Sequence, residues 1–471
     1  MLKVFEHHVP MSTLVALLAD SAFCFLAVMV ASMQLPGGPF AAQGASVPMA
    51  TALVLAAAFT GVMSLLYSFV GIYRSGSAPV SLGGMLGRAF FALFMGSCIA
   101  YLALEAQGDS AYALRLAGRA VPIMAAGAIT VRVMVYLAQR ASIGARRVLI
   151  VGTGEEAHAV AADLAASGTS SRHAVVGFYP TSTDAVDTTA SGALTVFSSN
   201  LSIGDIVRQQ GVDEVIVAVR EQRGGSVPMD QLLACRIAGV PVLDLAGFFE
   251  RARGEVPIDS LKASWLVYGH GFVQGSLRRL VKRVFDVVSS AVLLVLALPV
   301  MLITAIAIKL ESPGPVIYRQ ERVGLGGRSF MCLKFRSMRN DAEKDGVARW
   351  ATQNDARVTR VGALIRKMRI DELPQLVSVL RGEMSMVGPR PERPSFVTQL
   401  KAQIPYYDIR HSVKPGVTGW AQVRYSYGAS LEDARRKHQF DLYYVKNNSL
   451  FLDLLVLIET VSVVLFREGA R

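Results

Sequence analysis

Cysteine is scarce in this chain, and charged residues are few for its length. The 471 residues include four cysteines, and no two of them have the C-x-x-C spacing of a zinc or redox site. Their wide separation predicts no disulfide framework and is typical of reduced thiols. Only 18% of the residues are charged whereas 52% are hydrophobic, a balance that is typical of membrane proteins rather than soluble enzymes.

Acidic residues are also outnumbered by basic ones. Lysine and arginine total 48, against 36 for aspartate and glutamate, which gives a formal net charge of +12. A surplus of positive charge suits nucleic acid, an anionic membrane surface or a substrate rich in phosphate. The long apolar segments of the chain favour membrane lipids and a phosphate-rich substrate, and we expect no nucleic-acid partner.

Four apolar segments in the first third of the chain predict a transmembrane bundle. They cover residues 11–33, 47–70, 89–104 and 111–138. A helix requires about 20 apolar residues to cross the hydrocarbon core. The first two segments are nearly uncharged over that length, which disfavours the alternative of a buried hairpin in a soluble fold. We therefore predict four transmembrane helices within residues 1–140, without a cleavable signal peptide.

Basic residues at the two ends of this bundle predict its orientation. Lys3 precedes the first segment, Arg146 and Arg147 follow the fourth, and the first loop has no charge. Because basic flanks mark the cytoplasmic side, both ends of the bundle are predicted to face the cytoplasm. The rest of the chain should then be cytoplasmic unless it crosses again.

Residues 141–260 alternate between strand and helix patterns. Such alternation predicts a parallel, doubly wound, Rossmann-like domain. Gly152 and Gly154 belong to a G-x-G-x-x-A pattern after the first strand, which makes them weak nucleotide-binding candidates. The second strand lacks the acidic residue that would hold a ribose at its end. The sequence therefore favours a structural or regulatory domain over a catalytic NAD site and leaves nucleotide binding undecided.

A fifth apolar run, residues 284–308, is also long enough to span a membrane. Basic residues flank both of its ends, and Pro299 near its middle removes a helical hydrogen bond. We predict a re-entrant helix over residues 283–310 that bends at Pro299 and returns to the same face. An ordinary kinked spanning helix is the alternative. The final apolar stretch, residues 450–466, is predicted to be an interfacial or packed helix.

The C-terminal region combines two adjacent carboxylates with many cations. Asp371 and Glu372 precede Pro374 and an apolar helical pattern, so we predict that a helix starts at about Asp371. Alone, such carboxylates would be capping groups. Arginine suits phosphate oxygens, and a carboxylate pair suits Mg²⁺. The predicted phosphate-binding cations are Lys334, Arg336, Arg366, Arg369 and Arg390.

Six motifs, in this order, resemble the bacterial sugar transferase family of monotopic phosphoglycosyl transferases. They are Lys282-Arg283-Val284-Phe285-Asp286, Lys334-Phe335-Arg336-Ser337-Met338, Asp371-Glu372-Leu373-Pro374-Gln375, Gly388-Pro389-Arg390-Pro391, Pro415-Gly416-Val417-Thr418-Gly419-Trp420 and Asp441-Leu442-Tyr443-Tyr444. The resemblance implies a catalytic α/β domain over residues 278–471 that contains the re-entrant helix. The predicted fold class is therefore a membrane α-helical bundle plus α/β, similar to the large members found in exopolysaccharide operons.

The resemblance also implies an activity. Such an enzyme transfers a sugar-1-phosphate from a UDP-sugar to polyprenyl (undecaprenyl) phosphate, the initiating step of exopolysaccharide synthesis. Asp371 would be the nucleophile of a covalent phospho-aspartyl mechanism, and Glu372 would hold Mg²⁺. The protein would be a multi-pass inner-membrane protein with its active site on the cytoplasmic face. No residue identifies the sugar, and the extra Rossmann-like domain makes a homo-oligomer an open expectation.

Three alternatives remain open from sequence. A membrane-anchored NAD-dependent sugar-nucleotide dehydratase or epimerase is disfavoured, because none of the fourteen tyrosines has a lysine four residues later. A conventional glycosyltransferase is disfavoured by the lack of an Asp-x-Asp pattern. A scaffold that uses the transferase fold only for assembly is the third.

Overall fold

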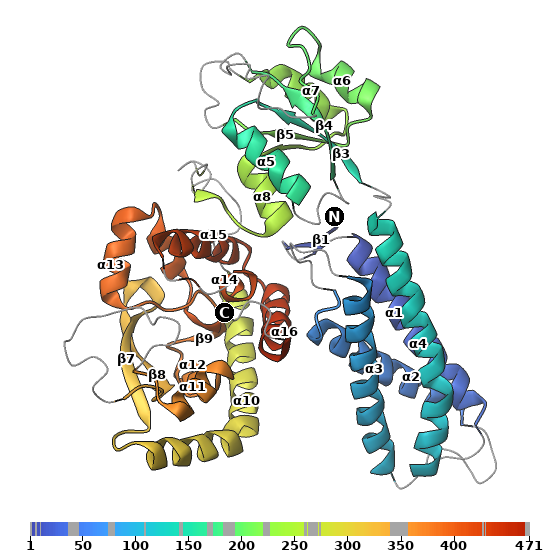
Figure 1. Ribbon diagram of the computed structural model, residues 1–471, viewed down its shortest axis with the longest axis vertical. Helices are drawn as coiled ribbons and strands as arrows, with labels where there is room; N and C mark the ends of the chain where they lie inside the picture. Colours follow the sequence, from blue (N-terminus) through green and yellow to red (C-terminus); the bar gives the residue numbers. More distant parts are fainter. Residues whose placement is uncertain are drawn as a thin grey trace. The chain divides into compact units, whose positions relative to one another are not determined.

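The chain forms two compact units that meet in sequence between Phe248 and Phe249. The structure is a computed structural model, drawn in Figure 1. It describes residues 2–4, 7–9, 11–35, 47–73, 81–107, 110–140, 145–166, 173–181, 194–219, 227–258, 261, 272, 275–339, 357–425, 428 and 430–466. Near the start of the chain, two short strands, β1 (Leu2–Val4) and β2 (His7–Val9), pair with each other.

Four long helices form the membrane bundle of the first unit. They are α1 (Met11–Met33), α2 (Met49–Phe69), α3 (Leu82–Glu105) and α4 (Ser110–Arg140). The third helix begins earlier than predicted, because Ser81 caps it by accepting a hydrogen bond from the Gly84 N–H. Five described helices are long and apolar enough to cross a membrane, namely these four and α10 (Ser276–Glu311). Length and composition alone therefore do not limit the spans to the four predicted.

A buried ion pair joins the first and last helices of this bundle. The Arg132 guanidinium on α4 lies 2.5 Å from Asp20 Oδ2 on α1, and the Tyr73 hydroxyl donates to the same oxygen at 2.6 Å. The rings of Tyr67 and Tyr73 each lie 5.7 Å from the guanidinium carbon. Charged residues inside apolar helices are stable only when they are paired in this way.

A four-stranded parallel sheet forms the rest of the first unit. Its strands run in the order β4 (His173–Tyr179), β3 (Arg146–Val151), β5 (Glu214–Val217) and β6 (Val242–Asp244). Its helices are α5 (Glu155–Ala166), α6 (Ile203–Gln210), α7 (Met229–Ile237) and the beginning of α8 (Leu245–Arg253). The parallel sheet is confirmed. Figure 1 shows α6 and α7 on the opposite side of the sheet from α5.

The second unit combines helices with two small sheets. Strands β7 (Ile317–Val323) and β8 (Ser329–Phe335) form an antiparallel hairpin around the turn η2 (Leu325–Gly327), and β9 (Ser385–Val387) pairs in parallel with β10 (Gly416–Thr418). The helical elements after α10 are α11 (Arg360–Lys367), η3 (Ile370–Glu372), α12 (Gln375–Arg381), α13 (Pro394–Gln403), η4 (Tyr407–Ser412), α14 (Trp420–Arg424), α15 (Leu431–Asn447) and α16 (Leu450–Phe466).

The first arm of α10 is fixed to this unit by polar contacts. Arg283 donates to the carbonyls of Val379 and Leu380 at 2.6 and 2.7 Å, which satisfies two C-terminal carbonyls of α12. The Asp286 carboxylate accepts a hydrogen bond from the Ser385 hydroxyl at 3.0 Å. The Lys-Arg-x-x-Asp motif therefore fastens the beginning of α10 to the second unit.

The second arm of α10 is fixed to the same unit by its apolar side. Ile308 packs against Phe335 and Ile365, and the Glu311 carboxylate accepts from the Arg360 N–H at 2.7 Å. Figure 1 shows the two arms meeting at a sharp bend. Pro299 lies inside this helix, and an internal proline causes such bends by removing a hydrogen bond.

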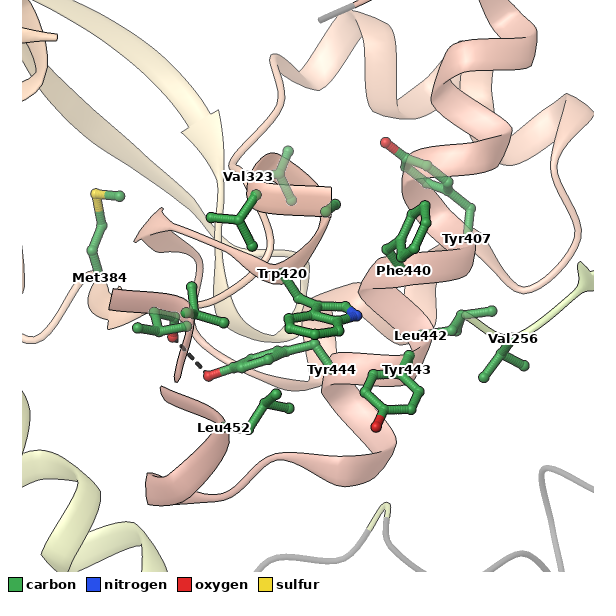
Figure 2. Packing of buried hydrophobic residues seen from close by; sticks show 14 of the residues in the cluster. Val256, Val323, Met384, Tyr407, Trp420, Phe440, Leu442, Tyr443, Tyr444 and Leu452 are labelled. Atoms are coloured by element: carbon green, nitrogen blue, oxygen red, sulfur yellow. Dashed lines mark hydrogen bonds between the residues drawn. The ribbon is translucent and has the colours of Figure 1, made fainter. Parts of the chain in front are cut away.

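An aromatic cluster forms the core of the second unit, and Figure 2 shows Trp420, Tyr443 and Tyr444 at its centre. The Trp420 ring stacks on Tyr443, with 5.7 Å between the ring centroids. The Trp420 indole N–H donates to the Gly254 carbonyl at 2.7 Å, and Val256 is fully buried in the same cluster. Residues 249–258 therefore belong to this unit, although the predicted middle domain extended to residue 260 and the predicted catalytic domain began at residue 278.

The final helix, α16, packs onto the second unit, in agreement with the packed form of the prediction. Its acidic residues are paired inside the protein: Asp453 with Lys282 at 2.9 Å and Glu459 with Arg424 at 2.7 Å. These pairs explain how an apolar helix can contain two buried carboxylates.

Candidate active site

The carboxylate pair lies in a short 3-10 turn and not at the start of the helix. Asp371 and Glu372 end η3, whereas α12 begins at Gln375, after Pro374. The predicted helix start at Asp371 was therefore wrong. Arg369 precedes the turn with φ of 58°, a left-handed conformation that is uncommon for a residue with a side chain. Arg369 lies between α11 and η3, and both carboxylates that follow it are buried.

Three cations surround the Glu372 carboxylate. Its Oε1 atom lies 2.8 Å from an Arg390 guanidinium nitrogen and 3.0 Å from Lys334 Nζ. The Arg369 guanidinium lies further away, at 3.9 Å. Lys334 comes from β8 and Arg390 from the loop after β9, so residues far apart in sequence meet at one oxygen.

The pKa values of the two carboxylates are shifted in opposite directions. Burial raises the pKa of Asp371, and the neighbouring charge of Glu372 raises it further. Burial would also raise the pKa of Glu372, but the charges of Arg390 and Lys334 hold that pKa well below its usual range. Glu372 is therefore the permanently ionised partner in this site.

The Asp371 carboxylate has no structural task among the described residues. The side chain is 9% exposed, and no described residue forms a hydrogen bond or ion pair with it. Its neighbour Ile370 packs against the cluster of Ile308 and Phe335. The second arm of α10, which carries Ile308, therefore contacts the η3 turn through Ile370. A buried, uncommitted carboxylate beside several cations is suited to act as a nucleophile on a phosphate.

Glycines allow two loops to approach closely and hold Arg390. The Gly388 N–H donates to the Thr418 carbonyl at 3.0 Å, and the Gly416 N–H donates to the Pro389 carbonyl at 3.0 Å. A Cβ atom on Gly388 would lie 2.3 Å from the Lys414 carbonyl oxygen, so only glycine fits there. Backbone hydrogen bonds thus join the Gly-Pro-Arg-Pro and Pro-Gly-Val-Thr-Gly-Trp motifs, and together the two loops hold Arg390.

Comparison with known proteins identifies the family. A model of the bacterial sugar transferase family matches residues 277–467. A UDP-glucose:undecaprenyl-phosphate glucose-1-phosphate transferase of Caulobacter vibrioides is 46% identical over 191 residues, 40% of this chain and 71% of that protein. The exopolysaccharide production protein PSS of Rhizobium leguminosarum is 41% identical over 186 residues, 38% of this chain and 92% of that protein. This chain belongs to the bacterial sugar transferase family.

The likeness that the sequence motifs indicated is thereby confirmed. A bacterial sugar transferase relative named UDP-N-acetylgalactosamine-undecaprenyl-phosphate N-acetylgalactosaminephosphotransferase, from Aeromonas hydrophila, is 45% identical over 240 residues, 51% of this chain and 56% of that protein. The chain spans about half the length of this relative and of a glucose-1-phosphate transferase from Escherichia coli, of which 40% is covered.

Two of the predicted phosphate-binding cations do not join the cluster around Glu372. Arg336 is buried, and its guanidinium donates to the carbonyls of Ser312 and Pro313 at 2.8 and 2.9 Å. It therefore holds the chain at the end of α10, and the phosphate-binding role stays a prediction. Arg366 lies in the last turn of α11, and its side chain forms no hydrogen bond or ion pair with the described residues.

The glycine pattern of the middle domain has a structural explanation. Gly152 has φ of 118°, and a Cβ atom there would lie 2.8 Å from the Ala218 carbonyl oxygen. Its N–H donates to the Tyr179 carbonyl at 2.8 Å and is not available to a pyrophosphate. Gly154 accepts a hydrogen bond from the His158 N–H in the first turn of α5. These contacts favour the structural interpretation of the turn.

The residues around the site are compatible with magnesium. No group of three histidine, cysteine, aspartate or glutamate side chains forms a metal cage among the residues that the structure describes. Mg²⁺ commonly takes only one or two carboxylates and completes its shell with water and substrate phosphates. The Asp371–Glu372 pair fits that requirement, although one oxygen of Glu372 already accepts from two cations.

Arg410, which no sequence pattern indicated, forms a buried ion pair with Asp441 at 2.8 Å. The signal available in the sequence was Asp441 itself, an acidic residue in the otherwise apolar Asp-Leu-Tyr-Tyr stretch of α15. A buried carboxylate requires a cationic partner, but its identity depends on the fold.

Proposed function

We propose that this chain transfers a sugar-1-phosphate from a UDP-sugar to undecaprenyl phosphate and so initiates a glycan such as an exopolysaccharide. The observation that carries the proposal is the uncommitted Asp371 carboxylate beside an ion cluster of Glu372, Lys334 and Arg390. The printed names of the relatives describe this reaction, with glucose in two of them and N-acetylgalactosamine in another. They do not favour the dehydratase alternative.

Asp371 begins the reaction in this proposal. One carboxylate oxygen attacks the phosphorus that carries the sugar, an oxygen–phosphorus bond forms, and the bond to the bridging diphosphate oxygen breaks. The nucleoside monophosphate leaves with the electron pair. A phosphate oxygen of the lipid then attacks the phospho-aspartyl phosphorus, which forms the lipid diphosphate and releases the carboxylate.

The cations perform the electrostatic part of this reaction. Lys334 and Arg390 point their charges at the carboxylate pair and would meet the diphosphate oxygens of the donor there. Their positive charge offsets the repulsion between Asp371 and an anionic substrate. Arg369 is half-exposed at the rim, where it would contact the outer phosphate.

Magnesium is part of the proposal, held by Glu372 together with substrate phosphate oxygens. When bound, it neutralises the negative charge of the diphosphate and of the leaving nucleoside monophosphate. We expect the Glu372→Gln variant to lose activity or its dependence on magnesium. Full wild-type activity in the presence of a chelator would contradict the metal role.

The α10 helix is proposed to enter the membrane and return to the cytoplasmic face. Both arms are fastened to the same catalytic unit, the first through Arg283 and Asp286 and the second through Ile308. Large apolar side chains between these anchors, such as Val295 and Leu296, are 71% and 70% exposed and require lipid cover. This arrangement supports an active site at the inner face of the cell membrane, where soluble donor and lipid acceptor meet.

The decisive experiment supplies both substrates to protein purified in nanodiscs. The protein is incubated with undecaprenyl phosphate and a panel of UDP-sugars, and the nucleotide and lipid products are identified by mass spectrometry. We expect uridine monophosphate and a lipid-linked diphosphate sugar. Release of uridine diphosphate would identify a conventional glycosyltransferase, and no product with any sugar would refute the proposal.

A further inference from the structure

The Gly388–Glu392 loop that carries Arg390 is held almost entirely through its carbonyl oxygens. Pro389 and Pro391 have no N–H, so these two residues can be fixed only through their carbonyl acceptors, whereas the Gly388 N–H donates to Thr418. The Pro389 carbonyl accepts from the Gly416 N–H at 3.0 Å, and the Glu392 carbonyl from the Val323 N–H at 2.9 Å. The two carbonyls between them, of Arg390 and Pro391, require other donors.

Two arginines supply these donors, one before the loop in the sequence and one after it. Arg410, on η4, donates to the Arg390 carbonyl at 2.8 Å. Arg322, on β7, donates to the Pro391 carbonyl at 3.0 Å. Four consecutive carbonyls are thus bound by four separate donors, and the Arg390 side chain leaves the backbone between the Gly416 contact on Pro389 and the Arg410 contact on its own carbonyl.

We propose that Arg322 and Arg410 are positioning residues that aim Arg390 at the phosphate of the donor. The inference rests on the proposed transfer reaction and adds to it a reason for the rigid backbone of the loop. Arg390 contacts Glu372 at 2.8 Å, and a rotation of the two peptides that follow it would move the guanidinium away from that position. The Arg410 contact fixes the first of these peptides, and the Arg322 contact fixes the second. Neither Arg322 nor Arg410 needs to touch the substrate.

Arg410 is itself immobilised by its other hydrogen bonds. Its Nε and one terminal nitrogen donate to Asp441 at 3.1 and 2.8 Å, and its remaining terminal nitrogen donates to the Tyr407 hydroxyl at 2.8 Å. Only a planar guanidinium can satisfy a carboxylate, a hydroxyl and a carbonyl at once. A lysine at this position would reach at most part of this set.

Arg322 has a similar role, but its side chain is more exposed to solvent than that of Arg410. Its guanidinium also lies 3.6 Å from the Glu392 carboxylate and donates to the Gln320 side chain at 2.5 Å. The side chain is 16% exposed, so its removal leaves less buried charge unpaired than removal of Arg410. Arg322 is therefore the better residue for a test.

The test is a double-mutant cycle on nucleoside monophosphate release in nanodiscs. We expect Arg322→Gln to lower kcat/KM by about tenfold, which is less than the roughly hundredfold loss that a misplacement of about 1 Å can cause. In an Arg390→Ala background the same change should lower kcat/KM by less than about twofold, because the guanidinium that Arg322 positions is already absent. Arg319→Gln on the same strand is the matched control, since this exposed side chain has no hydrogen bond or ion pair with the described residues. Equal losses in both backgrounds would overturn the inference.

A structure of the Arg322→Gln variant decides the same question without any activity. We expect the Pro391 carbonyl to turn and the contact between Arg390 and Glu372 to lengthen beyond 2.8 Å, with the rest of the unit unchanged. An unmoved loop would refute the positioning role. Arg322→Lys should restore part of kcat/KM, since an ammonium can still donate to one carbonyl. An inactive wild type would count against the proposed reaction alone, because the geometry of the loop would still be measured.

Discussion

Removal of the Lys334 charge should shift the pH dependence of the reaction toward higher pH. Lys334 Nζ lies 3.0 Å from Glu372 Oε1, and its charge also lowers the pKa of Asp371. Two unit charges at this distance attract by roughly 5 kcal/mol at an effective dielectric constant of about 20. That attraction is the one with Glu372; the Lys334 side chain is 19% exposed, and Arg390 and Arg369 also lower the pKa of Asp371, so only part of this energy acts on Asp371.

The direction of this shift follows from the charge of the nucleophile. Asp371 must be ionised to attack, and burial already raises its pKa above the ordinary value. Loss of the nearby cation raises that pKa further, so a smaller fraction of Asp371 is ionised at any pH near the transition. In Lys334→Met, the acid limb of kcat/KM should therefore move to higher pH.

The assay is nucleoside monophosphate release between about pH 4 and 8, the range over which a raised carboxyl pKa is expected to be visible. Lys334→Arg keeps the charge and should keep the position of the acid limb, even if its rate is lower. An acid limb that stays in place or moves to lower pH in Lys334→Met would refute the assignment of Asp371 as the ionised nucleophile beside this cation.

Three further changes test the site and the bundle. Asp371→Asn should abolish transfer while the melting temperature in detergent stays equal or rises, because the variant removes a buried carboxylate whose pKa is raised; a large fall in melting temperature would contradict this. Gly388→Ala places a Cβ 2.3 Å from a carbonyl oxygen and should cost about 2 kcal/mol or more in stability, whereas Gly275→Ala meets no atom within 4 Å and should cost little. Asp20→Ala leaves Arg132 buried without its partner and should destabilise the bundle by about 3–5 kcal/mol, with a smaller loss in the double Ala variant.

The membrane helices were predictable because a single property, apolar length, determines them. The segment from Met11 to Met33 was predicted with the bounds that α1 has in the structure. The start of α3 was missed, because Gly83, Gly84 and Gly87 dilute the apolar signal and the Ser81 cap depends on a local hydrogen bond. The number of helices that cross depends on the environment of α10, which composition cannot decide.

The site was predictable at the level of residue types but not of contacts. Asp371, Glu372, Lys334 and Arg390 were selected from the sequence, and the structure places them together. The same reasoning selected Arg336, which holds the carbonyls of Ser312 and Pro313 instead. An arginine in a motif suits a phosphate and a pair of carbonyls equally well, because both present oxygen acceptors to the same fork.

The domain boundary shows a similar limit. Nothing in the sequence around Gly254 marks it as part of the catalytic unit, yet its carbonyl accepts the indole N–H of Trp420 and Val256 is buried in the same core. The buried indole N–H of Trp420 needs an acceptor, and the acceptor that it finds, the Gly254 carbonyl, lies far away in sequence. Long-range satisfaction of buried polar groups is therefore the information that local patterns lack.

The bend in α10 and the geometry of the carboxylate turn depend on each other. The second arm presents Ile308 to Phe335, the residue after Lys334, and to Ile370, the residue before Asp371. The same apolar contact therefore fixes two chain segments whose neighbouring residues, Lys334 and Asp371, belong to the charged site. A straight helix anchored at Arg283 and Asp286 would carry Ile308 away from this cluster and leave Ile370 and Phe335 without their packing partner. Burial of these side chains favours the bent form by about 1.5–3 kcal/mol each, so the folded catalytic turn itself stabilises the bend at Pro299.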